Sequence, residues 1–144
     1  MYSVNPMNIL FIDDDPDDGE VLKNYLNKIN PSIQFLQVFD GWDAIMHLQK
    51  LTSAALPALI VLDINMRIID GFEFLKVIKG EEKFRNIPII VYSTSSKKED
   101  ENLSLSLGAV NYFTKPKTTH GMQEVVEIFA SYFNTEPLIN TTSG

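Results

Sequence analysis

The chain has 144 residues, 44% of them hydrophobic, and a formal net charge of −7. This length suits one domain with a sizeable core, and the acidic balance argues against binding to nucleic acid or to an anionic membrane surface. The chain has no cysteine, which excludes disulfides, zinc–thiolate sites and thiol catalysis. No signal-peptide pattern opens the chain and no apolar stretch approaches the roughly 18 residues that cross a bilayer, so we expect a cytoplasmic protein.

Short apolar runs rich in β-branched residues alternate with longer amphipathic stretches along the chain. This alternation is typical of βα units around a parallel sheet, and thus of the α/β class. Strands are predicted at residues 8–12, 33–39, 59–62, 88–92 and 110–114. Helices are predicted at residues 16–29, 42–51, 72–78, 98–107 and 119–133. We expect a single domain over residues 1–134 and a polar tail over residues 135–144, with no output module after the last helix.

Polar side chains follow four of the predicted strands at the point where each strand ends. The acidic run Asp13–Asp15 follows the first strand and Asp63 the third, whereas Ser93 and Lys115 follow the fourth and fifth. The carboxyl ends of parallel strands share one edge of a sheet, and ligands bind in the crevice there. Carboxylates, a hydroxyl and an ammonium group at that edge are suited to hold a divalent cation and a phosphoryl group.

These residues and their neighbours resemble the receiver domain of two-component response regulators, over about residues 7–133. The resemblance rests on four motifs in order: Ile12-Asp13-Asp14-Asp15-Pro16; Asp63-Ile64-Asn65-Met66 with Asp70-Gly71; Pro88-Ile89-Ile90-Val91-Tyr92-Ser93; and Gly108-Ala109-Val110-Asn111-Tyr112-Phe113-Thr114-Lys115-Pro116. It implies a doubly wound, flavodoxin-like (βα)5 fold with a five-stranded parallel sheet in the order 2-1-3-4-5. It also implies a stand-alone signalling module rather than an enzyme that turns over an external substrate.

The resemblance assigns a role to each polar residue at the strand ends. Asp63 becomes the phosphoacceptor, which fits the ability of a carboxylate to attack phosphorus and form an acyl phosphate. Lys115 and Ser93 bind phosphoryl oxygens, and Ser93 together with Tyr112 forms the conformational switch. Partners implied in this way are a histidine kinase or phosphotransfer protein as donor and a downstream protein target.

A magnesium site accompanies the phosphoacceptor in the family. Its ligands here are expected to be the side chains of Asp13, Asp14 and Asp63 and the backbone carbonyl of Asn65. Oxygen ligands with several retained waters suit Mg²⁺, for which Mn²⁺ or Ca²⁺ can substitute.

Three further features lead to expectations of their own. Leu103, Leu105 and Leu107 cannot all face the same side of a helix, so at least one is expected in solvent. In the family this fourth helix, with strand five and helix five, forms the docking or homodimer face. Arg67 replaces the usual proline, an insertion is expected around residues 51–58, and Lys115-Pro116 is a candidate cis peptide.

Alternative interpretations remain open from the residues alone. In a phosphatase of the haloacid-dehalogenase type, Asp13 would be the nucleophile and Asp15 the general acid, which leaves Asp63 unexplained. A pseudo-receiver would bind partners without phosphorylation. The run Asp13–Asp15 could also merely cap a helix. An EF-hand is rejected because Asp18 and Asn24 stand where it needs glycine and glutamate, and the distant His47 and His120 are interpreted as ordinary histidines.

Overall fold

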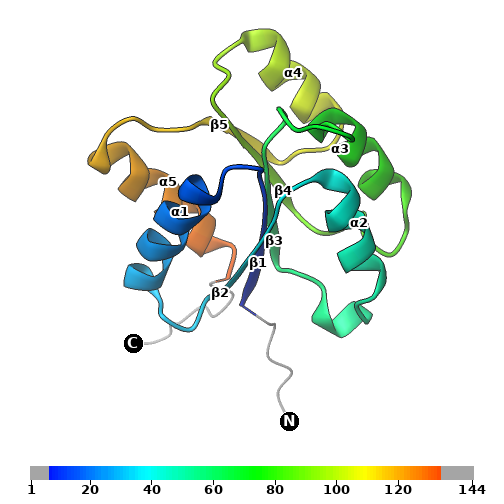
Figure 1. Ribbon diagram of the computed structural model, residues 1–144, viewed down its shortest axis with the longest axis horizontal. Helices are drawn as coiled ribbons and strands as arrows, with labels where there is room; N and C mark the ends of the chain where they lie inside the picture. Colours follow the sequence, from blue (N-terminus) through cyan, green and yellow to red (C-terminus); the bar gives the residue numbers. More distant parts are fainter. Residues whose placement is uncertain (1–6, 134–144) are drawn as a thin grey trace, which may run out of the picture.

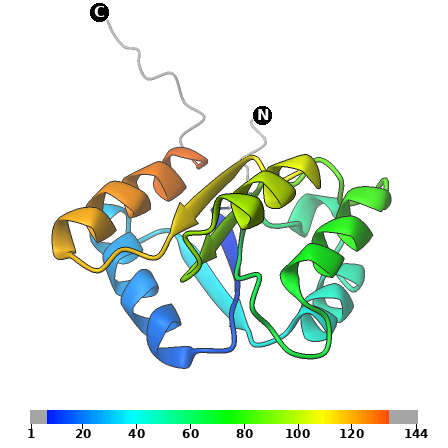
Figure 2. The same ribbon diagram turned by 90° about the horizontal axis from the view of Figure 1, so that it is seen from above.

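The computed structural model describes residues 7–133, in which five parallel strands form one sheet with helices on both faces (Figures 1 and 2). The strand order is β2-β1-β3-β4-β5, which confirms the predicted α/β architecture. The strands are β1 (Asn8–Ile12), β2 (Gln34–Val38), β3 (Leu59–Leu62), β4 (Ile89–Ser93) and β5 (Asn111–Thr114). In the register of the sheet, Ile12 lies opposite both Val38 and Leu62, so the strands end together at one edge.

The helices form two groups, one on each face of the sheet (Figure 2). The first group is α1 (Pro16–Ile29) and α5 (Thr119–Ser131); the second is α2 (Gly41–Gln49), α3 (Gly71–Gly80) and α4 (Lys98–Ser106). A short 3-10 helix (Ser53–Ala55) lies where the sequence predicts an insertion. No helix within residues 7–133 is both long and apolar enough to traverse a bilayer.

The core is divided by the sheet into two apolar layers. Along β1, Ile9 and Phe11 pack toward α1 and α5, whereas Leu10 and Ile12 pack toward α2 and α3. This division follows from the alternation of side chains along a strand. All residues of β3 and β4 are buried, which confirms that these are central strands covered on both faces.

Side-chain caps set the start of four helices. Asp15 accepts a hydrogen bond from the backbone N–H of the second residue of α1. Asp40, Asp70 and Thr118 each accept one from the third residue of α2, α3 and α5. Helices α2 and α3 therefore begin one residue earlier than predicted. Of the three acidic residues after β1, Asp15 caps α1. Capping of this helix therefore does not account for Asp13 and Asp14.

The structure corrects one expectation and confirms another. The Lys115–Pro116 peptide is trans, since residues 7–133 contain no cis bond; trans is the isomer favoured by about 0.5–1 kcal/mol before proline. Leu103 and Leu105 are more than 40% exposed on α4, as their spacing predicts. Residues 135–144, predicted as a polar tail, lie outside the described residues.

Candidate functional site

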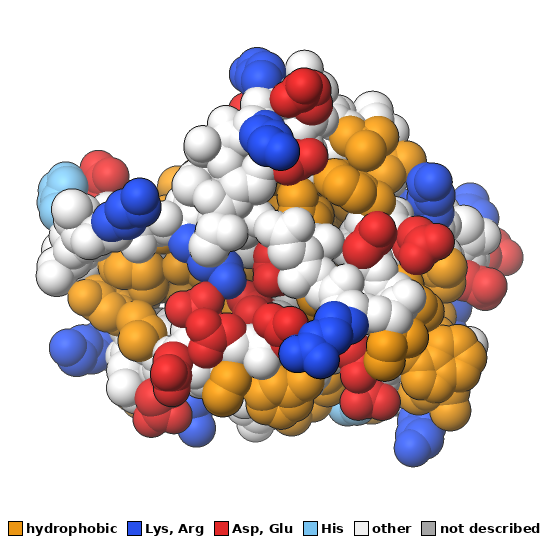
Figure 3. All heavy atoms as spheres, turned by 45° about the horizontal axis from the view of Figure 1, so that its top comes forward, with side chains coloured by type: hydrophobic (Ala, Val, Ile, Leu, Met, Phe, Trp, Pro, Cys, Tyr) orange, Lys and Arg blue, Asp and Glu red, His pale blue; other side chains and the backbone are white. Residues whose placement is uncertain are grey.

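Three carboxylates meet where β1 and β3 end. Asp13, Asp14 and Asp63 each offer an oxygen, and these oxygens lie within 4.8 Å of one another. Asp13 and Asp63 are buried, whereas Asp14 is exposed at the mouth of the site. In Figure 3 acidic side chains gather near the middle of this face with basic side chains beside them. Such a cluster of oxygens, two of them buried, suits a hard divalent cation.

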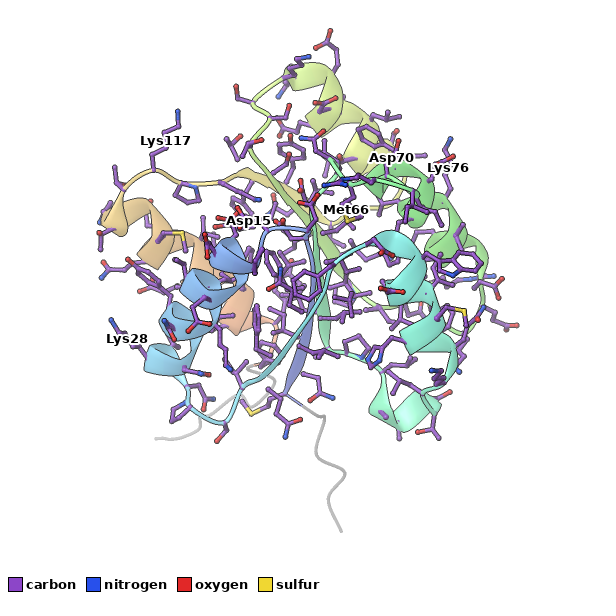
Figure 4. The ribbon with its side chains drawn as sticks, viewed as in Figure 1. Asp15, Lys28, Met66, Asp70, Lys76 and Lys117 are labelled. Atoms are coloured by element: carbon purple, nitrogen blue, oxygen red, sulfur yellow. The ribbon has the colours of Figure 1, made fainter. Side chains whose placement is uncertain are left out.

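The loops that carry these groups lie at one end of the sheet. Figure 4 shows Asp15 from the β1–α1 loop on the same end as Met66 and Asp70 from the β3–α3 loop, whereas Lys28 lies at the opposite end of α1. The parallel register explains this grouping, because every strand points its carboxyl end the same way.

Burial disfavours the ionised form of the two inner carboxylates, and the charge of Asp13 adds repulsion at Asp63. Burial, reinforced by the charge of Asp13, raises the pKa of Asp63 from 3.8 to about 6. Burial also raises the pKa of Asp13, although its hydrogen bonds with Lys115 and the Asp15 N–H oppose the rise. A cation bound between the two side chains would relieve this repulsion, which is the electrostatic fit expected of a metal site.

Lys115 supplies the positive charge of the site from the end of β5. Its Nζ lies 2.7 Å from Asp13 Oδ2 and 2.7 Å from Asp18 Oδ2, and 5.8 Å from the centroid of the Tyr92 ring. Burial alone would lower the pKa of Lys115, but the hydrogen bonds to both carboxylates outweigh it and raise the pKa. Among the described residues its ammonium makes no hydrogen bond with Asp63.

Ser93, at the end of β4, is linked to Asp63 through Asn65. The buried Ser93 Oγ accepts a hydrogen bond of 3.4 Å from Asn65 Nδ2, and the Asn65 backbone N–H donates to Asp63 Oδ1 at 3.2 Å. Ser93 Oγ also accepts from the Ser95 N–H at 3.2 Å. The hydroxyl therefore lies at the neighbouring strand end and is connected to the loop that leads into α4.

That loop joins Ser93 to Tyr112. The buried Tyr112 donates its O–H to the Ser95 carbonyl at 2.8 Å, and Thr114 Oγ1 donates to the same carbonyl at 3.1 Å. Ser95 Oγ in turn donates to Asp100 Oδ2, on the first turn of α4, at 2.5 Å. The two residues predicted as the switch, Ser93 and Tyr112, thus hold the same short segment at the start of α4.

Two residues of the site were missed by sequence reasoning. Gln37, on the edge strand β2, donates from Nε2 to the carbonyls of Asp13 at 2.8 Å and Asp15 at 3.0 Å, so it holds the acidic loop. A Cβ added at Gly19 would lie 1.8 Å from Gln37 Oε1, so a larger residue there would displace the Gln37 side chain from this position. The sequence indicates no role for Asp18 beyond its place in the rejected EF-hand loop. The sequence carries no local signal for either contact.

Together these groups define an α/β protein with a cluster of carboxylates, a hydroxyl and a lysine at one edge of its parallel sheet. A family model described as the response regulator receiver domain matches residues 9–127. The chain therefore belongs to the response regulator receiver domain family.

Individual relatives agree with this membership. Chemotaxis protein CheY1 of Helicobacter pylori is 26% identical over 122 residues, which cover 85% of this chain and 95% of CheY1. The phosphorylated cyanobacterial phytochrome response regulator RcpA matches with a TM-score of 0.78 at 27% identity, over 89% of this chain and 94% of that one. The Mn²⁺-bound response regulator Rcp1 matches with a TM-score of 0.76 at 27% identity, over 94% and 96%.

Family membership determines the class of function. The chain is a receiver domain of two-component signalling, and its partners belong to the histidine kinases or phosphotransfer proteins. Receiver domains are signalling modules rather than enzymes that turn over an external substrate. The phosphatase alternative, in which Asp13 is the nucleophile, is not favoured.

Proposed function

We propose that Asp63 is the phosphoacceptor of this receiver domain. The observation that carries the proposal is the position of Asp63 at the end of β3, buried beside Asp13 and Asp14 and linked through Asn65 to Ser93. Asp63 Oδ attacks the phosphorus of a phosphohistidine; the O–P bond forms as the P–N bond breaks, and the histidine leaves with the electron pair. Phosphoryl transfer leaves little covalent work for the protein, so positioning and charge neutralisation dominate.

The cation ligands follow from the same geometry. We propose that Asp13, Asp14 and Asp63, with the backbone carbonyl of Asn65, hold Mg²⁺, for which Mn²⁺ or Ca²⁺ can substitute. Support comes from the clustered carboxylate oxygens and from the relative Rcp1, whose structure is of a Mn²⁺-bound form. The bound cation supplies neutralisation of the charge on the reacting oxygens.

Ser93 and Lys115 bind the transferred group. Ser93 Oγ donates a hydrogen bond to one phosphoryl oxygen, and the Lys115 ammonium pairs with another as a point charge. When Ser93 turns toward the phosphoryl group it releases the Ser95 N–H, and the loop that Tyr112 holds moves with it. The same site supports slow autodephosphorylation by water.

Phosphorylation of Asp63 passes its signal on through a change in the protein surface around α4. Leu103 and Leu105 are exposed on α4, beside the loop that Ser93 and Tyr112 control. We propose that the α4–β5–α5 face binds a downstream protein target or a second copy of the chain, in the cytoplasm.

Labelling with acetyl phosphate and Mg²⁺, followed by borohydride reduction and peptide mapping, tests the assignment. We expect the label on Asp63, its loss in Asp63→Asn, and only a reduced yield in Asp13→Asn. A label on Asp13 would instead support the phosphatase mechanism, and the absence of any label would support the pseudo-receiver.

A further inference from the structure

The first turn of α1 provides Lys115 with a second acidic partner. Asp18 Oδ2 lies 2.7 Å from Lys115 Nζ, the same distance as Asp13 Oδ2 on the other side. The lysine side chain is 13% exposed and that of Asp18 is 37% exposed, so the pair is only partly open to water. The same ammonium lies over the Tyr92 ring, 5.8 Å from its centroid.

The two carboxylates that pair with Lys115 would respond differently to a cation bound at the acidic cluster. Asp13 belongs to the acidic cluster with Asp14 and Asp63, whereas Asp18 does not. A cation that engages Asp13 therefore weakens its attraction for Lys115. The attraction of Asp18 for the same ammonium remains, because Asp18 is no ligand of that cation.

Lys115 cannot pair fully with Asp18 and with a phosphoryl group on Asp63 at the same time. A phosphoryl group on Asp63 requires the ammonium to move toward it, since the ammonium now bonds to Asp13 and Asp18 and to no atom of Asp63 within residues 7–133. This movement lengthens or breaks the contact with Asp18. A hollow of about 260 Å³ beside the pair, lined in part by Asp18, Tyr92 and Lys115, leaves room for the released carboxylate to enter water.

We infer that Asp18 competes with the phosphoryl group for Lys115 and so limits how tightly the activated state is held. Asp18 acts through the lysine and touches neither the phosphorus nor the cation, so it is a positioning residue. The inference rests on the proposed phosphorylation of Asp63 and adds a regulator of that site.

The test compares Asp18→Asn with Asp17→Asn. Asp17 is the neighbouring residue on α1; it is exposed, and its side chain makes no hydrogen bond within the described part of the chain. Both variants remove one negative charge, but only Asp18→Asn removes a contact with Lys115. The readout is the affinity for beryllofluoride at saturating Mg²⁺, followed by NMR, and the half-life of the phosphorylated protein.

We expect Asp18→Asn to bind beryllofluoride roughly two- to fivefold more tightly than Asp17→Asn, the range that loss of a partly exposed ion pair allows. The phosphoryl half-life should lengthen in the same variant. Asp18→Glu, which keeps the carboxylate, should return toward the wild-type affinity. In a Lys115→Met background the effect of Asp18→Asn should disappear.

Other outcomes would overturn the inference. Equal affinities of the Asp18 and Asp17 variants, with normal labelling of Asp63, would refute the competition and leave the phosphoacceptor intact. Weaker binding in Asp18→Asn would mean that Asp18 steadies the lysine for catalysis instead. If the wild-type protein bound no beryllofluoride at Asp63, both the inference and the proposed function would fall.

Discussion

Replacing Asp63 by asparagine should stabilise the protein in the absence of a divalent cation. Asp63 is 5% exposed, and the pKa of its carboxyl is raised from 3.8 to about 6, first by burial and then by the charge of Asp13. The pKa of Asp63 is higher in the folded state than in the unfolded state. The contribution of this carboxyl to folding stability is therefore fully present below about pH 4 and is lost as the pH rises through 6. The ionised carboxylate therefore costs about 3 kcal/mol of stability above pH 7.

Urea unfolding measures this cost, with the fluorescence of Trp42, the single tryptophan, as the probe. In EDTA at pH 7.5 we expect Asp63→Asn to unfold with a free energy about 1–3 kcal/mol above that of the wild type. At pH 4 the difference should fall to about 0.5 kcal/mol, since Asp63 is then protonated in the folded state. Asp14→Asn is the matched control: because Asp14 is exposed, we expect a smaller gain in the free energy of unfolding.

Saturating Mg²⁺ should narrow the difference at pH 7.5, because cation binding stabilises the wild type more than the variant. The reasoning would be refuted by an Asp63→Asn protein no more stable than the wild type at pH 7.5. A gain that stayed the same at pH 4 would refute it as well, because the gain would then have a cause other than ionisation.

Three more substitutions have definite expected outcomes. Lys115→Met should lower the free energy of unfolding by about 2–4 kcal/mol in urea denaturation, because it leaves the buried Asp13 without its cation; an unchanged value would contradict the ion-pair account. Gln37→Leu should weaken Mg²⁺ binding about tenfold in a titration, since it releases the acidic loop, whereas Gln34→Leu on the same strand should not. Ile68→Gly should raise the free energy of unfolding by about 1 kcal/mol in thermal denaturation, because Ile68 is 78% exposed with a φ of 70°; destabilisation would show that the side chain matters more than the strain.

Much of the fold could be predicted because its signals are local. The unbroken apolar runs of β3 and β4 indicated central strands, and all their residues are buried. The placement of Asp63 and Lys115 directly after strands predicted a shared edge, since parallel strands end together. The strand order came from the family resemblance rather than from residue patterns.

The remaining features depend on contacts between residues far apart in the chain. Gln37 is 24 residues from Asp13, and Asp18 is 97 residues from Lys115, so no local pattern marks either pair. The sequence also does not predict the isomer of the Lys115–Pro116 peptide bond, which is trans. The cis and trans forms before proline differ by only about 1 kcal/mol, so a sequence motif does not distinguish them.

The central claim is that the groups at the strand ends surround one cation and one phosphoryl group on Asp63. A crystal structure with Mg²⁺ and beryllofluoride tests it most directly. The account predicts beryllium bonded to an Asp63 oxygen, fluorines on Ser93 Oγ and Lys115 Nζ, and Mg²⁺ on Asp13, Asp14 and Asp63. Beryllium on Asp13, or Lys115 still paired with Asp18 and remote from every fluorine, would contradict it.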